Sequence, residues 1–478
     1  MVTITRRLAQ QLRTVLRRAF GNIRGEGPAI GFIAGVEGLI VRSTYGDIAI
    51  ECRLPGERTT ETLWLPFDFL ADVAGKNDEP VELEATGDGQ ISVQWRTGNV
   101  PHAVTYDAVV PFEADKFPVL PKAFTANVGL LQALHEASEV TDSDSSRFAV
   151  SCLQLCPDGT INATDGRQML SQSGFNFPWQ ESILVPRNKV FASPELPQNK
   201  PAAIAQSGEW AVLSAGRWTV YLRINTGSYP DVSRHIPNPE SAKARCQLSK
   251  DDIRFLIETL PQLPCNDEVN SPVTIDLNGH VAIRAKAADQ IKPTEVILTN
   301  SQWTGEPVRI NINRKYLARA IRLGLNDLSL YGEESALLCQ GFGRKMVWMP
   351  LDKGSALPPA EDVIRIESPT GEIAAPIPQL VTPREVPTMT EPTIATNGNT
   401  TSNGQAKTDT TNPKAFRRKV ALQDIAALIE DAEKLRTAAH NLMCQASGVV
   451  KGLKQHRRQN RAVQQTIAQL RTLKSLGV

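Results

Sequence analysis

Arginine spacing carries much of the chemical information in this chain of 478 residues. At 100° per residue, residues 4–20 are predicted to form a helix with one apolar face and guanidinium groups on nearly the opposite side. A second predicted helix, which begins near residue 314, repeats the pattern. Such faces neutralise phosphates without reading sequence, so they predict a polyanionic partner; the alternative is an ordinary solvated helix face. The basic residues on the two faces are Arg6, Arg13, Arg17, Lys315, Arg319 and Arg322.

Catalytic and metal-binding motifs are missing from the sequence. The six histidines never approach one another, or a Cys, Asp or Glu set, at ligand spacing. No Ser/His/Asp, Cys/His, phosphate-loop or Gly-rich dinucleotide arrangement occurs in its required context. We therefore expect no enzymatic activity, no metal and no cofactor. An enzymatic alternative would need a polar cluster formed only in three dimensions, such as Asp165 with Arg167.

Charge is divided unevenly along the chain. The formal net charge is +1, but residues 414–478 hold 13 Lys and Arg against four Asp and Glu, a net charge of +9, which leaves −8 for residues 1–413. Apolar residues in this basic tail recur at three- and four-residue steps and predict helices, as a hairpin or coiled coil. The charge favours nucleic acid as a partner of the tail; alternatively, its apolar stripe oligomerises or docks a protein.

The composition is that of a soluble, multi-domain protein. The chain is 41% hydrophobic and 22% charged, and it contains no apolar run long enough to cross a bilayer. Seven scattered cysteines, an odd number with no Cys-x-x-Cys pair, fit a reducing cytoplasm. Sequence therefore predicts a cytoplasmic protein without a membrane partner.

An internal repeat predicts the domain organisation. Three segments, 63–75, 183–193 and 310–321, each read as a strand leading into a short helix, and each is preceded by a longer helix and followed by a hairpin signal. Residues 354–413 contain nine prolines and a polar run, which predicts a flexible linker. We expect three α+β domains, a linker and a tail, over residues 1–121, 122–240, 241–353, 354–413 and 414–478.

Four short motifs point to a known family. Ala163-Thr164-Asp165-Gly166-Arg167 is followed by Ile183-Leu184-Val185-Pro186-Arg187, by Tyr229-Pro230-Asp231 leading to Ile236-Pro237, and by Met349-Pro350-Leu351. In order and spacing, residues 2–352 resemble the bacterial DNA sliding clamp, the beta subunit of DNA polymerase III. The resemblance implies three tandem clamp domains with helices inside and sheets outside. It also implies a head-to-tail homodimeric ring that slides on duplex DNA at the nucleoid.

The same resemblance implies a peptide pocket between the second and third domains. Such a pocket tethers polymerase, clamp loader or repair proteins, which makes the ring a processivity factor. The matching positions are Val150, Thr164, Gly166, Arg167, Gln168, Met169, Pro237, Val347 and Met349.

Two departures qualify the resemblance. Arg167-Gln168-Met169 stands where the family usually has His-Arg-Leu, which moves the positive charge by one position. A clamp normally ends just after its final strand, near Leu351 here, so the linker and tail have no counterpart. The alternative function is a clamp-fold scaffold, assembled through its tail, that does not encircle DNA.

Overall fold

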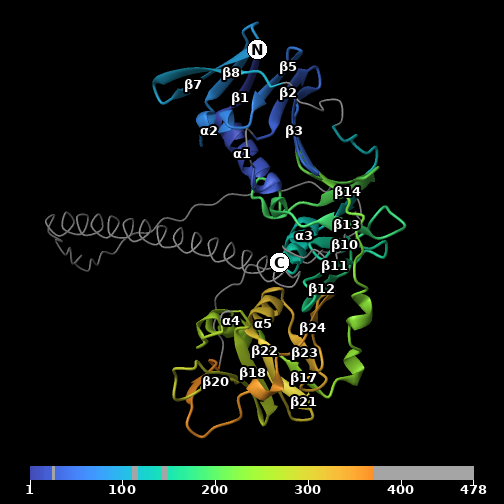
Figure 1. Ribbon diagram of the computed structural model, residues 1–478, viewed down its shortest axis with the longest axis vertical. Helices are drawn as coiled ribbons and strands as arrows, with labels where there is room; N and C mark the ends of the chain where they lie inside the picture. Colours follow the sequence, from blue (N-terminus) through green and yellow to red (C-terminus); the bar gives the residue numbers. More distant parts are fainter. Residues whose placement is uncertain (24–26, 110–116, 143–148, 268, 371–478) are drawn as a thin grey trace, which may run out of the picture. The chain divides into compact units, whose positions relative to one another are not determined.

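The computed structural model describes residues 1–23, 27–109, 117–142, 149–267 and 269–370, which all belong to one compact unit, residues 1–379 (Figure 1). The predicted helical tail and most of the predicted linker lie outside these residues. Within them, three successive copies of an α+β unit follow one another along the chain. Each copy contributes two groups of strands, and its helices pack against the strands.

The first copy falls within the predicted range 1–121 and runs from β1 to β8. One four-stranded sheet has the order β1-β6-β7-β8, and the other four strands are ordered β5-β2-β3-β4. The elements are β1 (Val2–Thr5), α1 (Arg6–Phe20), β2 (Ala29–Gly35), β3 (Gly38–Tyr45), β4 (Ile48–Leu54), β5 (Glu61–Pro66), α2 (Phe69–Val73), β6 (Pro80–Ala85), β7 (Gln90–Thr97) and β8 (Val100–Asp107).

The second copy repeats this order, but one of its helices is shortened to a single 3-10 turn, η2. Asn188 caps this turn by accepting a hydrogen bond from Val190 N, and the extended Ser193 before Pro194 ends it. The elements are β9 (Thr125–Asn127), α3 (Leu130–Ser138), β10 (Cys152–Leu155), β11 (Ile161–Thr164), β12 (Gln168–Gln172), β13 (Ile183–Pro186), η2 (Lys189–Ala192), β14 (Ala202–Ser207), β15 (Trp210–Ala215) and β16 (Trp218–Arg223).

The third copy follows two short 3-10 turns, η3 (Ser233–His235) and η4 (Pro239–Ser241). The last strand that it shares with the other copies, β25, ends at Trp348, close to the predicted boundary at 353. The elements are β17 (Ala244–Gln247), α4 (Lys250–Thr259), η5 (Leu260–Gln262), β18 (Pro272–Asn278), β19 (His280–Ala285), β20 (Thr294–Leu298), β21 (Gln302–Gly305), β22 (Val308–Asn313), α5 (Arg314–Arg322), β23 (Asp327–Leu330), β24 (Leu337–Gly341) and β25 (Arg344–Trp348).

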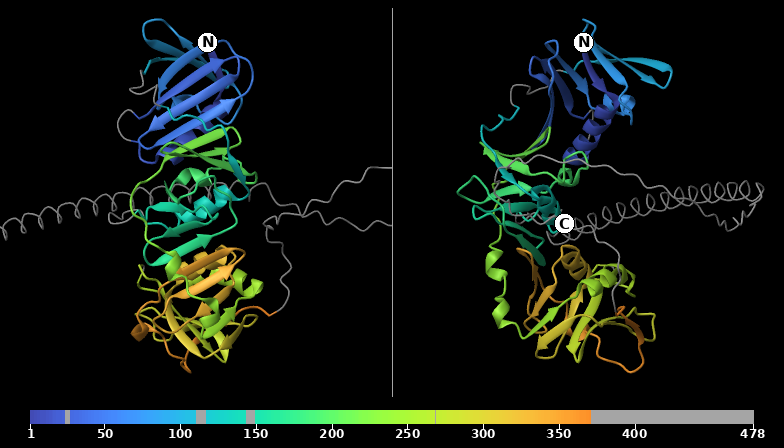
Figure 2. Two further views of the ribbon diagram at one scale, coloured as in Figure 1. Left: turned by 90° about the vertical axis from the view of Figure 1, so that its right-hand side faces the viewer. Right: turned by 180° about the vertical axis from the view of Figure 1, so that it is seen from behind.

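Neighbouring copies are joined by continuous sheets. Strand β4 of the first copy pairs antiparallel with β16, the last strand of the second, and β12 of the second copy pairs antiparallel with β25, the last strand of the third. Each junction therefore joins the same two positions of the repeat. Two further views show the helices and η2 on one side of these sheets (Figure 2).

Helix α1 shows how the sequence places its basic residues. Its N-cap Thr5 accepts a hydrogen bond from Leu8 N at 3.1 Å, and Gly21, with φ of 67°, ends the helix. The predicted apolar face is buried in the main core: Leu8, Leu12, Val15, Leu16 and Ala19 are each at most 5% exposed. Burial of this face against β4 and α2 turns the opposite face of the helix outward.

The start of the predicted linker needs correction. Residues from 354 onward were expected to be flexible, but η6 (Lys353–Ser355) and β26 (Ile364–Glu367) lie in the fold, and β26 pairs in parallel with β20. The proline content concealed an alternation of apolar and charged residues in Ile364-Arg365-Ile366-Glu367 that is typical of a strand. With β21, which pairs with β17, the third copy therefore has two strands that neither of the other copies has.

Candidate functional sites: a basic helix face and a junction pocket

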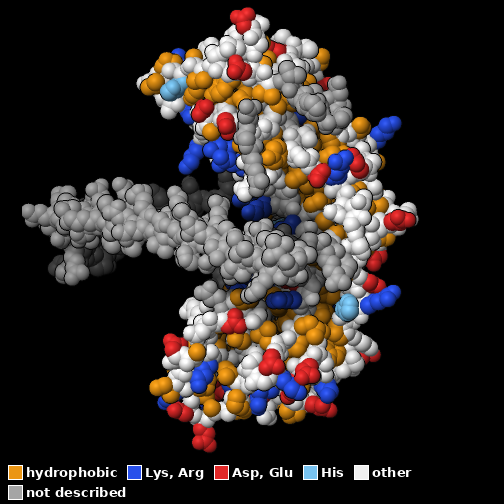
Figure 3. Space-filling view, viewed as in Figure 1, with side chains coloured by type: hydrophobic (Ala, Val, Ile, Leu, Met, Phe, Trp, Pro, Cys, Tyr) orange, Lys and Arg blue, Asp and Glu red, His pale blue; other side chains and the backbone are white. Residues whose placement is uncertain are grey.

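The outward face of α1 forms a basic surface. Gln10, Arg13, Thr14, Arg17 and Arg18, which we call the α1 basic face, line a shallow hollow of about 270 Å³. The side chains of Arg13 and Arg17 make no hydrogen bond or ion pair with any residue that the structure describes, so their charges are available to a ligand. In the space-filling view, a group of Lys and Arg side chains lies over α1 (Figure 3).

The structure places the Arg6 side chain away from the predicted basic face. Its guanidinium donates to the backbone carbonyls of Val73, Ala74 and Arg96, and it lies 3.4 Å from Glu79. The side chain is only 12% exposed. Because Val73 and Ala74 form the carboxyl end of α2, where a cation is favourable, Arg6 caps that helix. Sequence periodicity placed Arg6 on the basic face, but tertiary contacts withdraw it.

The predicted basic residues of α5 also divide into two kinds. Lys315 and Arg322 are exposed, whereas Arg319 is half-buried and donates from Nη1 to Gln168 Oε1 at 2.6 Å. Burial lowers the pKa of the Arg319 guanidinium. Arg319 therefore holds α5 against the β11–β12 turn of the preceding copy, and Lys315 and Arg322 are the α5 residues that remain at the surface.

One acidic side chain on the helices, Glu136, is engaged within the protein. Glu136 on α3 lies 2.9 Å from Arg344 of the third copy, accepts a hydrogen bond from Gln132, and is 13% exposed. Burial raises the pKa of the Glu136 carboxyl. This ion pair bridges two copies, so it limits the negative charge that Glu136 presents to solvent.

The peptide pocket predicted between copies is built around one turn. In the β11–β12 turn, Asp165 accepts hydrogen bonds from the backbone N–H of Arg167 and Gln168 and from the Gln168 amide. Gly166 supplies the left-handed conformation, with φ of 86°, that the turn requires. The Met349 N–H donates to the Arg167 carbonyl at 3.2 Å, which fixes the end of β25 beside the turn.

A cavity of about 380 Å³ opens at this point, and we call it the junction pocket. Its floor belongs to a small apolar cluster, separate from the main core, that contains Met169, Val232 and Val347. Met349 is 51% exposed at its rim. Apolar side chains with a guanidinium nearby suit aliphatic or aromatic peptide anchors. The lining residues are Thr164, Gly166, Arg167, Gln168, Met169, Pro230, Val232, His235, Ala336, Val347, Trp348 and Met349.

Seven of the nine residues predicted for the peptide site line this pocket. The two others, Val150 and Pro237, are not among the lining residues: Val150 is buried just before β10, and Pro237 lies half-buried after η3. Sequence reasoning missed Pro230, Val232 and His235, although the Tyr229-Pro230-Asp231 motif marked their segment. It also missed Ala336 and Trp348, because alanine and tryptophan in apolar segments are ordinarily core residues.

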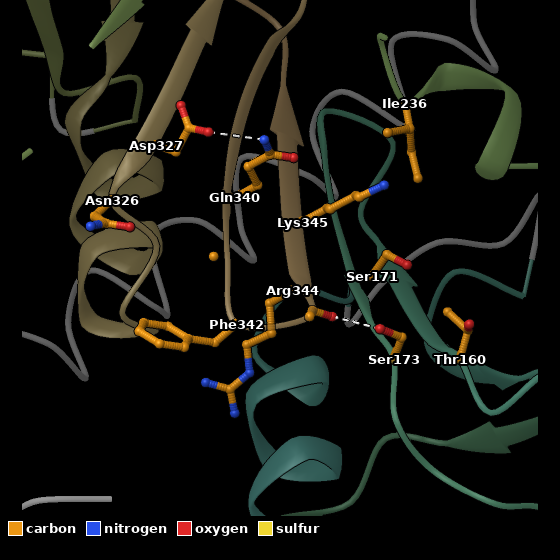
Figure 4. Close-up of a pocket in the computed structure, with 12 residues that line it drawn as sticks. Thr160, Ser171, Ser173, Ile236, Asn326, Asp327, Gln340, Phe342, Arg344 and Lys345 are labelled. Carbon is orange, nitrogen blue, oxygen red and sulfur yellow. Dashed lines mark hydrogen bonds between the residues drawn. The ribbon is translucent and has the colours of Figure 1, made fainter. Parts of the chain in front are cut away.

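A second cavity, of about 450 Å³, lies at the opposite end of the β12–β25 pair (Figure 4). Eight of its twelve lining residues have polar or charged side chains. Ser173 donates to the Gly343 carbonyl, Gln340 donates to Asp327, and Lys345 extends toward Ile236. Apolar anchors therefore have fewer partners here than in the junction pocket, although the exposed Phe342 lies at its edge.

Neither a metal-ligand group nor a membrane-spanning helix is found in the described part of the chain. Among the described residues, the side chains of His, Cys, Asp and Glu form no group of three that could hold a metal ion. Over the same residues, no helix combines the length and apolarity needed to span a membrane.

Burial raises the pKa of the Cys52 and Cys246 thiols to about 12, as is typical of core cysteines.

The architecture that positions both sites, three copies joined through equivalent strands, is the fold of the bacterial DNA sliding clamp. Two of the most similar solved structures are the DNA polymerase III subunit beta from Pseudomonas aeruginosa (TM-score 0.60, 18% identity) and the DNA polymerase sliding clamp from Bacillus subtilis (TM-score 0.62, 17% identity). A third is the beta chain of DNA polymerase III from Streptococcus pneumoniae (TM-score 0.60, 15% identity). The resemblance drawn from sequence is confirmed at the level of the fold.

These similarities cover 73% of this chain and 98–99% of each clamp chain. The remainder of this chain thus has no counterpart in them. No protein-family model matches the sequence. No curated protein matches it either.

Proposed function

We propose that this chain is a DNA sliding clamp or a clamp paralogue, without catalytic activity. As a head-to-tail ring dimer, it encircles duplex DNA and tethers polymerase, clamp loader or repair proteins through the junction pocket. The observation that carries the proposal is the α1 basic face. Arg13 and Arg17 have no acidic partner among the described residues, and they project from a fold whose solved examples include DNA polymerase sliding clamps.

The physical argument concerns how a ring holds DNA. A closed ring is retained topologically, so it needs many weak phosphate contacts and not a few strong ones. Guanidinium groups on α1, with Lys315 and Arg322 on α5, supply contacts of this kind because they neutralise phosphates without reading bases. A net charge of −8 over residues 1–413 disfavours DNA binding elsewhere on the body.

Retention on closed and linear DNA tests this proposal. The full chain is loaded onto nicked circular duplex, the complex is isolated by gel filtration at moderate salt, and half of it is cut once with a restriction enzyme. A sliding ring stays on the circle and leaves the cut molecule. Equal retention on both forms would support the scaffold alternative, in which DNA binds without passing through a ring.

A further inference from the structure

The two internal junctions define which strand edges a second molecule would use. In both, the fourth strand of one copy pairs with the last strand of the next copy: β4 with β16, and β12 with β25. Two strands at these positions have no partner in a neighbouring copy of the same chain. They are β8, the last strand of the first copy, and β20, the fourth strand of the third copy. A head-to-tail ring dimer, as proposed above, would therefore pair β20 of one chain with β8 of the other.

These two edges differ in the structure. Within the described residues, β8 has a neighbour on one side only, β7, and its Val100 and Val104 are 57% and 40% exposed. The corresponding edge of β20 is already covered, because β26 pairs with it through Thr294–Ile364, Glu295–Arg365, Val296–Ile366 and Ile297–Glu367. The strand that covers this edge comes from the same chain.

Specific contacts hold β26 on β20. The N–H groups of Ile364 and Ser368 donate to the carbonyls of Pro293 and Ile297, both at 2.9 Å. Arg365 donates from Nε to Glu295 Oε2 at 2.9 Å, and its Nη2 lies 2.8 Å from the same oxygen. Ser368, 2% exposed, accepts a hydrogen bond from the Thr299 N–H. The pairing is thus anchored at both ends and by an ion pair.

Few buried groups of the third copy depend on β26. All four residues of β26 are exposed, and Ile364 and Ile366 are 50% and 38% exposed, so little apolar surface depends on it. Glu295 keeps its second partner, Arg284, at 2.8 Å when Arg365 leaves. No buried carboxylate is then left without a cation, which is the costly outcome for such groups.

The outer edge of β26 is a poor substitute for β20. In an extended strand, alternate N–H groups point to opposite sides. Ile364 and Ser368 donate toward β20, so Ile366 does too, and only Arg365 and Glu367 point outward. Prolines 358, 359 and 369 lie on either side and offer no N–H. Short, charged, proline-flanked strands are typical protectors of sheet edges.

We propose that β26 is a tethered competitor for ring closure: it occupies the edge of β20 that would accept β8 of a second copy, so a ring closes only after β26 leaves β20. This inference rests on the proposed ring. Because β26 is covalently attached, it competes at a high effective concentration and raises the protein concentration needed for dimerisation. Loss of β26 pairing therefore strengthens the dimer.

Proline substitutions in the full chain test this competition. Ile366→Pro removes the N–H that points toward β20, whereas the matched control Glu367→Pro removes one that points outward. We expect sedimentation velocity to show a dimer dissociation constant at least about tenfold lower for I366P than for the parent chain, and an unchanged value for E367P. Faster hydrogen exchange of residues 364–368 in I366P verifies release of the strand.

A second pair of variants tests the same release through the ion pair. Arg365→Glu places two carboxylates together and should also tighten the dimer, while Arg365→Lys keeps the charge and should resemble the parent chain. If variants with a released β26 have an unchanged or higher dimer dissociation constant than the parent chain, β26 does not compete with dimerisation. Weakening by both proline variants would instead mean that β8 pairs with β26.

Retention on circular duplex separates failure of this inference from failure of the proposed function. If the parent chain and I366P dimerise equally well and both are retained on circles, the inference is overturned and the clamp function stands. If neither the parent chain nor the released variants form dimers or remain on circles, the ring itself is refuted and the inference falls with it.

Discussion

Charge reversal on the α1 basic face gives the sharpest prediction for DNA binding. The variant Arg13→Glu/Arg17→Glu changes two side chains that have no partner among the described residues and are not part of the core. The fold should therefore be retained, because surface substitutions away from packed or paired groups usually change stability by less than about 0.5 kcal/mol.

The magnitude follows from counterion release. The slope of log affinity against log salt is about −0.9 per neutralised phosphate, so two lost contacts make it shallower by about 1.8 for each chain. Over a fourfold rise in salt concentration, each contact contributes a factor of about 3.5 to the loss of affinity. The double variant should thus bind more weakly at low salt, and its affinity should fall less as salt is added.

The assay is fluorescence anisotropy with a short labelled linear duplex, measured from about 50 to about 200 mM salt for several unrelated sequences. Lys122→Glu is a suitable single-charge control. Lys122 is exposed on the segment whose Phe117 and Phe124 pack with Tyr221 in a cluster separate from the core that contains α1. An unchanged slope in the double variant, or an equal effect of K122E, would refute the role of this face.

Two further predictions concern the junction pocket and the third copy. Met349→Asp should weaken binding of a labelled pentapeptide with leucine and phenylalanine anchors at least about tenfold, because it places a charge at an apolar rim. Phe342→Asp, at the second cavity, should leave peptide binding unchanged. The reverse result would place the peptide site at the second cavity. Arg284→Ala should lower the free energy of unfolding by roughly 3–5 kcal/mol, since Asp276 and Glu295, each 3% exposed, lose their shared cation. Arg309→Ala removes a partly exposed arginine from Asp276 and should lower the free energy of unfolding in urea by about 1 kcal/mol or less. Equal losses of unfolding free energy in the Arg284 and Arg309 variants would contradict this explanation.

Local patterns could be predicted from sequence, because they depend on residues a few positions apart. The buried face of α1 and the Thr164–Gln168 turn are of this kind. The fold itself was accessible because the repeat and four motifs agreed. The Arg167 position, which departs from the family pattern, still lies at the pocket.

Long-range contacts explain what sequence could not supply. Arg6 satisfies the predicted helical face, yet carbonyls 67 to 90 positions away engage it. Arg319 is drawn to Gln168 across a junction between copies. Strand β26 was concealed because the prolines that flank it suggested a linker, and a strand of four residues is stable there only because it pairs with the edge of β20.

A structure of the full chain on duplex DNA would test the central claim most directly. We expect cryo-electron microscopy of the chain loaded on nicked circular duplex to show the double helix enclosed by protein, with Arg13 and Arg17 of α1 beside its phosphates. Duplex bound to the outer strands, or held by an assembly that does not surround it, would contradict the account.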